Sequence, residues 1–103
     1  FECSAISVED ELEGYILYLF VVSKQKDLDE KINSMIKSIF GVYALPKKIY
    51  YLTELPKTRS GKILRRLLRD ILLNPKSKDY GDLSTILNSE IVNEIQYVVT
   101  DNE

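Results

Sequence analysis

The chain has 103 residues, of which 45% are hydrophobic and 29% are charged, and its formal net charge is −2. This profile is typical of one small soluble domain and excludes a disordered tail. The absence of histidine excludes a Ser-His-Asp or Cys-His nucleophile pair. The single cysteine excludes an internal disulfide, and together the two counts exclude a Cys/His zinc site, so we expect no metal site. We expect Cys3 to be an inert core residue.

The first half of the chain predicts two strands. Residues 1–8 are short and partly alternating, which favours a strand. After an acidic turn that ends at Gly14, residues 15–22 are a continuous aromatic and β-branched run, which is typical of a strand covered on both faces. This is the longest apolar run, and a membrane helix needs about 20 residues, so no membrane span is expected. Residues 23–26 are polar and predict a loop.

A helix is then predicted to begin at Asp27, with Asp27 as its N-cap and Glu30 closing a capping box. Five apolar residues fall on one face of it: Leu28, Ile32, Met35, Ile36 and Ile39. Gly41 is expected to end this helix, and Pro46 favours extended chain after it. Residues 48–53 predict a second strong strand.

The second half predicts helices. After a loop over residues 55–62, residues 63–73 show helical spacing, with apolar residues on one face and basic residues on the other. The apolar stripe is Ile63, Leu64, Leu67, Leu68, Ile71 and Leu72, and the basic face is Arg65, Arg66 and Arg69. A polar linker over residues 76–82 leads to a short last helix, capped by Asn88 or Ser89, and to a frayed tail. We therefore predict an α+β fold, a small sheet of two to three strands with helices packed on it.

Charge is divided unevenly. Residues 47–78 contain ten basic and two acidic residues, a net charge of +8, and the remainder of the chain carries −10. A local cationic segment on an acidic protein favours an anion site over general binding of nucleic acid. A solvated basic helix face explains the same run and stays open as an alternative.

The segment Leu-Pro-Lys-Thr-Arg-Ser-Gly-Lys, residues 55–62, carries the chemistry. Pro56 stiffens its entry, Gly61 permits a sharp turn, and Thr58 and Ser60 supply hydroxyl groups. Lys62 is predicted at a helix N-terminus, where the dipole disfavours a cation, so we expect it to be aimed with nearby N–H groups at a phosphate or carboxylate. A Walker-type phosphate loop is rejected, because its first glycine and its Ser or Thr would stand at Pro56 and Ile63.

The stretch from Leu55 to Arg69 closely resembles the C-terminal lysine motif of acyl- and acetyl-coenzyme A synthetases, which are adenylate-forming enzymes. Asp10-Glu-Leu-Glu-Gly-Tyr15 is similar to the family's Asp-Glu-x-x-Gly-Glu segment, with Tyr15 in place of its acidic residue. Residues 81–87, Gly-Asp-Leu-Ser-Thr-Ile-Leu, resemble the tail of the acetyl-CoA synthetase branch. The resemblance covers about residues 4–97.

The resemblance implies an AMP-forming acetate–CoA ligase. Such an enzyme converts acetate and ATP to acetyl-adenylate and pyrophosphate, and then passes the acetyl group to the thiol of coenzyme A. Residues 1–103 would be its single C-terminal mobile lid domain, without the hinge and the first helix, and residues 76–103 a C-terminal extension. A start at Phe1 agrees with a fragment. We expect ATP and Mg²⁺ to bind in the absent large adenylation domain, and the chain alone to be inactive.

Lys62 matches the motif lysine, so the resemblance implies that its ammonium bridges the attacking carboxylate oxygen and the α-phosphate of the adenylate. Thr58, Arg59, Ser60 and Gly61 would position the loop. In a second orientation of the domain, Lys62 would swing away and another face would help to form the pantetheine channel. In the family the motif lysine is also a site of regulatory acetylation, which sirtuin-type deacetylases reverse. Acetylation would remove the charge of Lys62, and deacetylation would return it.

Three further cations are weaker candidates for contacts with phosphate. Lys37 matches an arginine that contacts the 3′-phosphate of coenzyme A in the acetyl-CoA synthetases, but lysine lacks the bidentate fork, and a solvent-facing lysine explains the position equally well. Arg65 and Arg66 would contact coenzyme A or nucleotide phosphates, the large domain, or only water. The implied location is the cytoplasm, with the nucleus as an additional site.

Two rival functions stay open at this point. The first is a stand-alone module that binds RNA or an acidic partner through residues 47–78. No aromatic residue is interleaved with the basic ones over residues 57–78, which disfavours stacking on bases, so no nucleic-acid partner is expected. The second is a degenerate synthetase that keeps this domain as a scaffold.

Overall fold

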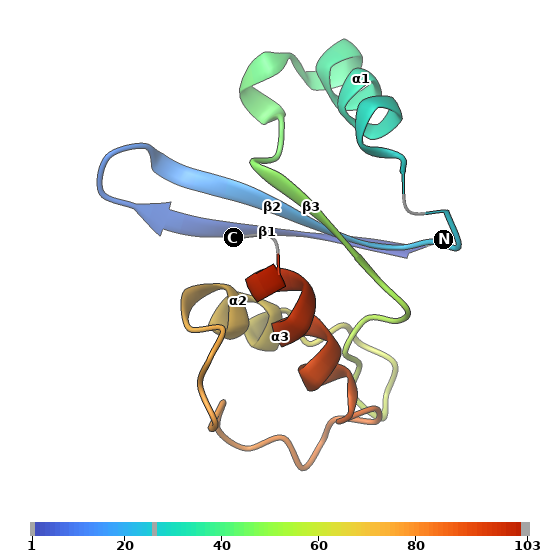
Figure 1. Cartoon of the computed structure of the whole chain (residues 1–103), viewed down its shortest axis with the longest axis vertical. Coiled ribbons are helices and arrows are strands. Elements are labelled where there is room, and N and C mark those ends of the chain that lie inside the picture. Colours follow the sequence, from blue (N-terminus) through green and yellow to red (C-terminus); the bar gives the residue numbers. More distant parts are fainter. Residues whose placement is uncertain (1, 26, 102–103) are drawn as a thin grey trace.

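Alternating and continuous apolar runs place three strands at the centre of the molecule (Figure 1). The computed structural model describes residues 2–25 and 27–101. Strands β1 (Glu2–Asp10) and β2 (Gly14–Val22) pair antiparallel, and β3 (Lys48–Leu52) pairs with β2 in parallel. The sheet order is β1-β2-β3. The predicted α+β class and the predicted strands are confirmed, except that Phe1 lies outside the described residues.

The turn between β1 and β2 fixes the register of the hairpin. The Asp10 carboxylate accepts the backbone N–H groups of Leu12 (3.3 Å) and Glu13 (2.9 Å), and Gly14 has a positive φ of 83°. Asp10 then pairs with Gly14, and the register runs without a bulge to Glu2 opposite Val22. Cys3 lies on this hairpin and is exposed, so its prediction as a core residue is wrong.

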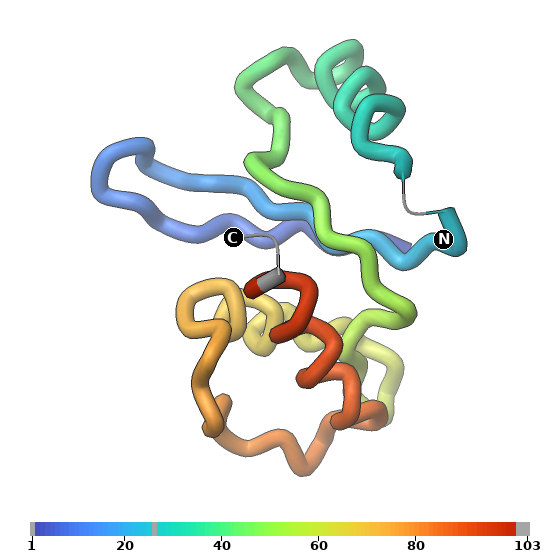
Figure 2. The backbone as a smooth tube through the Cα atoms, in the orientation of Figure 1, coloured from blue at the N-terminus to red at the C-terminus, as the bar shows by residue number. Residues whose placement is uncertain are grey.

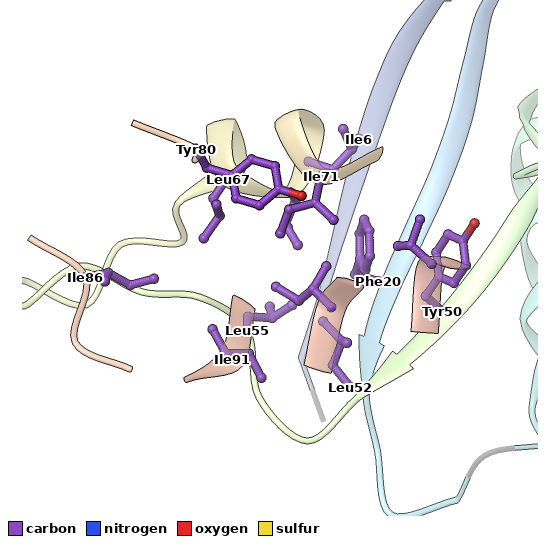
Figure 3. Close-up of a cluster of buried hydrophobic side chains, with 13 residues drawn as sticks. Ile6, Phe20, Tyr50, Leu52, Leu55, Leu67, Ile71, Tyr80, Ile86 and Ile91 are labelled. Atoms are coloured by element: carbon purple, nitrogen blue, oxygen red, sulfur yellow. The ribbon is translucent and has the colours of Figure 1, made fainter. Parts of the chain in front are cut away.

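The two faces of the sheet pack against different helices, as strand alternation requires. On one face, Phe20 is fully buried in the main core and stacks on Tyr50 with ring centroids 5.3 Å apart (Figure 3). On the other face, Leu19 and Val21 form a smaller cluster with Ile49. The prediction that β2 is covered on both faces is therefore confirmed for its second half.

Helix α1 (Asp29–Phe40) covers the smaller cluster and begins two residues after the predicted start. Leu28 occupies the N-cap position with no side-chain cap bond, so the predicted cap by Asp27 is wrong. The hydroxyl of Tyr51 from β3 accepts the N–H of Leu28 at 3.0 Å and donates to the Asp29 carboxylate. Burial, followed by this bond to Asp29, raises the pKa of Tyr51 to about 12. The sheet thus fixes the start of the helix.

Only part of the predicted apolar stripe of α1 is covered. Ile32 and Ile36 pack on the smaller cluster, whereas Met35 and Ile39 are 56% and 67% exposed. Gly41 ends the helix with a φ of 91°, as predicted, and a short 3-10 turn, η1 (Val42–Ala44), follows. Lys26, in the predicted loop, lies outside the described residues.

Helices α2 (Arg65–Leu73) and α3 (Ile91–Asp101) cover the main-core face of the sheet (Figure 1). Helix α2 begins two residues later than predicted. The Leu64 N–H donates to the carbonyl of Pro56 at 2.8 Å, and this bond keeps residues 63–64 out of the helix. Helix α3 runs further than predicted, to Asp101. Of the predicted frayed tail, residues 102–103 lie outside the described part.

The linker between α2 and α3 is irregular but anchored. Tyr80 is buried, and its hydroxyl donates to the carbonyl of Asn74 at 2.7 Å. The Gln96 amide of α3 donates to the carbonyls of Pro75 (3.2 Å) and Ser77 (2.9 Å). Across residues 2–25 and 27–101, no helix is long and apolar enough to cross a membrane. The same residues contain no group of three or more His, Cys, Asp or Glu side chains that could hold a metal ion.

Candidate functional site

The segment that carries Lys62 folds as a narrow hairpin, which we call the lysine loop (residues 57–63). Lys57 and Ile63 form an antiparallel bridge at its base. Inside it, the N–H of Gly61 donates to the carbonyl of Thr58, and the N–H of Thr58 donates to the carbonyl of Lys62, each at 2.9 Å. Gly61 has a φ of 90°, a backbone conformation that side chains disfavour. The loop therefore has a defined shape of its own.

The Thr58 and Ser60 hydroxyl groups make hydrogen bonds inside the loop. Thr58 Oγ1 lies 2.9 Å from Ser60 Oγ and accepts the N–H of Lys62 at 3.3 Å. Arg59 and Lys62 are exposed at the tip. Within the described part of the chain, no hydrogen bond or ion pair involves the Lys62 ammonium. Its charge and donor groups are directed to solvent, where a ligand can meet them.

Lys62 does not lie at a helix N-terminus, so that prediction is wrong. It stands in the hairpin, and α2 begins at Arg65 with Leu64 as the N-cap. Ile63 and Leu64 match the helical stripe in sequence, but their backbone pairs with Lys57 and Pro56 instead. The amides of α2 therefore do not join Lys62 in an anion site, and Lys62 stands on the hairpin before the helix.

Three contacts outside the motif hold the lysine loop on the domain, and sequence reasoning missed them. The Lys57 ammonium pairs with the Glu2 carboxylate of β1 at 2.6 Å. The backbone of residues 85–87 bonds to Lys57 and Arg59, and the Asn88 side chain bonds to Leu55 and Lys57. The only signal in the sequence was the resemblance of residues 81–87 to the acetyl-CoA synthetase tail, which named no contact.

Two arginines of α2 bind the free edge of the sheet. The Arg65 guanidinium donates to the carbonyl of Ala5 and to the hydroxyl of Ser4 at 3.4 Å. The Arg69 Nε donates to the carbonyl of Ser7 at 3.4 Å. Ala5 and Ser7 are two residues apart, so their carbonyls point to the same edge of β1. Charged groups on that edge also protect it from pairing with another strand.

Arg66 is bound inside the domain as well. Its Nη1 lies 2.8 Å from the Asp70 carboxylate and donates to the carbonyl of Tyr80 at 3.0 Å. In the linker after Tyr80, the N–H of Ser84 donates to the Asp82 carboxylate, and this bond lowers the pKa of the Asp82 carboxyl group. The arginines of α2 thus join this helix to β1 and to the linker between α2 and α3.

Lys37 and the lysine loop lie on opposite sides of the sheet. It is exposed in the last turn of α1, and α1 covers the opposite face of the sheet from α2 and α3 (Figure 1). The structure therefore brings together Thr58, Ser60, Gly61 and Lys62, with Arg59 on the same hairpin, and places Lys37 across the sheet.

Comparison with known proteins identifies the family of this domain. Residues 1–62 match the family described as the AMP-binding enzyme C-terminal domain, and that match ends at Lys62. The chain belongs to this family. An acetyl-coenzyme A synthetase of Coprinopsis cinerea is 38% identical over 92% of the chain, and one of Methanothrix thermoacetophila is 34% identical over 95%. The chain spans only 16% and 15% of those relatives.

Solved structures agree with this AMP-binding C-terminal fold. An acyl-CoA synthetase of Brucella canis superimposes with a TM-score of 0.63 and 31% identity, over 74% of this chain and 15% of its own. The acetoacetyl-CoA synthetase of Streptomyces lividans gives a TM-score of 0.70 over 96% of this chain and 16% of its own. Its identity is 15%, so it supports the fold alone. Thus the chain is a C-terminal domain of the kind found in adenylate-forming enzymes.

Proposed function

We propose that this chain is the C-terminal domain of an acetyl-CoA synthetase and supplies the lysine of the adenylation step. The observation that carries the proposal is the exposed Lys62 at the tip of a well-formed hairpin, in a chain 38% identical to an acetyl-coenzyme A synthetase. The whole enzyme would join acetate, ATP and coenzyme A to form acetyl-CoA, AMP and pyrophosphate. ATP and its Mg²⁺ would bind to a separate adenylation domain.

The proposed chemistry of Lys62 is electrostatic. When acetate attacks the α-phosphate of ATP, negative charge is shared between the attacking oxygen and the phosphate oxygens. An ammonium placed between them stabilises that charge as the bond forms, and it donates hydrogen bonds to both groups. Because the loop is already ordered by Thr58 and Gly61, little of this stabilisation is lost in fixing the loop at the moment of reaction.

The second half-reaction would use another face of the domain. Lys37 lies on the α1 side of the sheet, away from the lysine loop, and so would be presented when Lys62 is withdrawn. We propose that it meets the 3′-phosphate of coenzyme A as a point charge. Arg65 and Arg66 contact Ala5 and Asp70 instead, which favours a role in holding the domain together over a contact with coenzyme A.

The exposure of Lys62 also suits a modification. Acetylation of its ammonium would remove the charge and the donors that the adenylation step needs, and a sirtuin-type deacetylase would restore them. The proposed location of the enzyme is the cytoplasm, and additionally the nucleus.

No observation favours the rival stand-alone module. Arginines that would have formed its basic face contact carbonyl and carboxylate groups of the domain itself. Steep salt dependence of binding between the chain and generic RNA would restore that rival, whereas weak binding with a flat dependence agrees with the synthetase.

The proposal is tested with the full-length synthetase that carries this chain. The variant Lys62→Ala is compared with Lys78→Ala, which removes an exposed lysine of the linker. Acetate-dependent exchange between ATP and pyrophosphate reports the adenylation step. Loss of the ammonium should lower exchange by about 100- to 1,000-fold, as the loss of one oxyanion donor does, and Lys78→Ala should not change it.

The same assay separates the possible failures. Exchange that is supported by propionate or acetoacetate but not by acetate would leave the adenylation role intact and refute the acetate assignment. Wild-type exchange in Lys62→Ala would refute the role of Lys62. No exchange by the wild-type protein with any of the three acids would refute the synthetase assignment and favour a degenerate scaffold.

A further inference from the structure

The Asn88 side chain bridges two backbone groups at the base of the lysine loop. Its Nδ2 donates to the carbonyl of Leu55 at 3.0 Å, and its Oδ1 accepts the N–H of Lys57 at 3.2 Å. These two groups flank Pro56, which has no N–H group. The half-buried amide thus pairs with the strand-like entry of the loop as a neighbouring strand would.

The backbone before Asn88 continues the same pairing along the loop. The N–H of Leu87 donates to the carbonyl of Lys57 at 2.8 Å, Ile86 bridges Thr58, and the N–H of Arg59 donates to the carbonyl of Thr85 at 3.2 Å. We call residues 83–88 the clamp segment. In Figure 2 this segment, in orange, passes beside the yellow-green stretch that follows β3.

The clamp segment is anchored to the core through Ile86. Ile86 is 6% exposed and belongs to the main cluster with Leu55 and Ile91 (Figure 3). The tip of the lysine loop, by contrast, is exposed from Arg59 to Lys62. The direction in which the tip points is therefore set at its base, by buried Pro56, by the Lys57–Glu2 pair and by the clamp segment.

From these contacts we infer that Asn88 is a positioning residue for Lys62, acting through the clamp segment; this inference rests on the adenylation role proposed above. It extends the site beyond the residues that the family model matches, because that match ends at Lys62 and Asn88 lies after it. In this chain the clamp couples residues 83–88 to the loop that carries the reacting charge.

The experiment compares Asn88→Ala and Asn88→Asp with Asn93→Ala, which removes an exposed asparagine of α3. In the 103-residue chain, hydrogen exchange of the Arg59 and Leu87 amides reports the clamp, and exchange of the β1–β2 amides reports the fold. In the full-length synthetase, initial rates of acetate-dependent ATP–pyrophosphate exchange give kcat and KM.

Asn88→Ala should speed exchange of the two clamp amides and leave the β1–β2 amides unchanged. It should lower kcat of the adenylation step by about 10- to 100-fold, as expected when a reacting group is misplaced by about 1 Å, with the KM for acetate and ATP unchanged. Asn88→Asp keeps an acceptor for the Lys57 N–H and should recover part of the rate, and Asn93→Ala should match wild type.

The outcomes separate this inference from the proposed function. If Lys62→Ala abolishes adenylation while Asn88→Ala keeps wild-type kcat, the positioning role is refuted and the proposed function stands. If Lys62→Ala has no effect, the proposed function fails, and faster clamp exchange in Asn88→Ala still supports the structural contact. If Asn88→Ala does not fold, Asn88→Asp decides: wild-type kcat together with wild-type clamp exchange would overturn the inference.

Discussion

Replacing Gly61 by alanine tests whether the shape of the lysine loop matters separately from the stability of the domain. Gly61 has a φ of 90°, and a Cβ built there meets nothing within 4 Å. The cost of Gly61→Ala is therefore backbone strain alone, about 1–2 kcal/mol for a positive φ. With a urea m-value of about 1–2 kcal/mol/M, the unfolding midpoint of the chain should fall by about 0.5–2 M.

Gly14→Ala is the matched control, because Gly14 has a φ of 83° and equally open surroundings but lies in the β1–β2 turn. Both variants should lose similar stability in urea unfolding followed by circular dichroism. Only Gly61→Ala should also lower ATP–pyrophosphate exchange in the full-length protein, by about 10-fold or more. Equal effects of the two variants on exchange would refute the reasoning, and so would an unchanged urea midpoint in Gly61→Ala.

Two further predictions concern the contacts that hold the layers together. The Tyr51 hydroxyl binds its proton more tightly in the folded than in the unfolded chain, because burial and Asp29 raise its pKa to about 12 from an ordinary value near 10. Its stabilising effect is therefore present below pH 10 and is lost as the pH rises to 12. The fall in unfolding free energy over that range should be smaller in Tyr51→Phe, and equal falls would contradict the assignment. Arg66→Ala should lower the free energy of unfolding by about 0.5–1.5 kcal/mol, because the contacts with the Asp70 carboxylate and the Tyr80 carbonyl are lost. Lys31→Ala, at an exposed position, should lower it by about 0.5 kcal/mol or less. The KM for coenzyme A should not change in Arg66→Ala, and an increased KM at wild-type stability would favour the phosphate-binding role instead.

Elements whose identity depends on local pattern were predictable from the sequence. β2 and β3 are rich in β-branched and aromatic residues, and Gly41 ends α1 where a glycine is expected. Pro56 and Gly61 predicted the turn before Lys62, whereas the lysine motif itself was recognisable only by its resemblance to a known family. These features need no knowledge of what packs against them.

Features decided by distant contacts were not predictable. Asp27 is a better N-cap than Leu28 by residue type, but Tyr51, 23 residues after Leu28, fixes the start of the helix. Ile63 and Leu64 continue the helical stripe of α2, yet the carbonyl of Pro56 takes the Leu64 N–H. Tertiary bonds overrode local preference in both cases.

The arginines of α2 and Asn88 show the same limit at the candidate site. Arg65 looks like a solvent-facing cation in sequence, but its partner is the carbonyl of Ala5, 60 residues away. Asn88 has the composition of a helix cap, whereas its side chain bonds to residues 31 and 33 positions earlier. Neither separation leaves a periodic trace in the sequence, so only the folded arrangement reveals the clamp.

The central claim is that Lys62 serves the adenylation step and not the thioester-forming step. The most direct measurement compares the two half-reactions in full-length Lys62→Ala: ATP–pyrophosphate exchange with acetate, and acetyl-CoA formation from supplied acetyl-adenylate and coenzyme A. We predict that exchange falls by about 100-fold or more while thioester formation stays close to wild type. Equal losses in both half-reactions, or undiminished exchange, would contradict the claim.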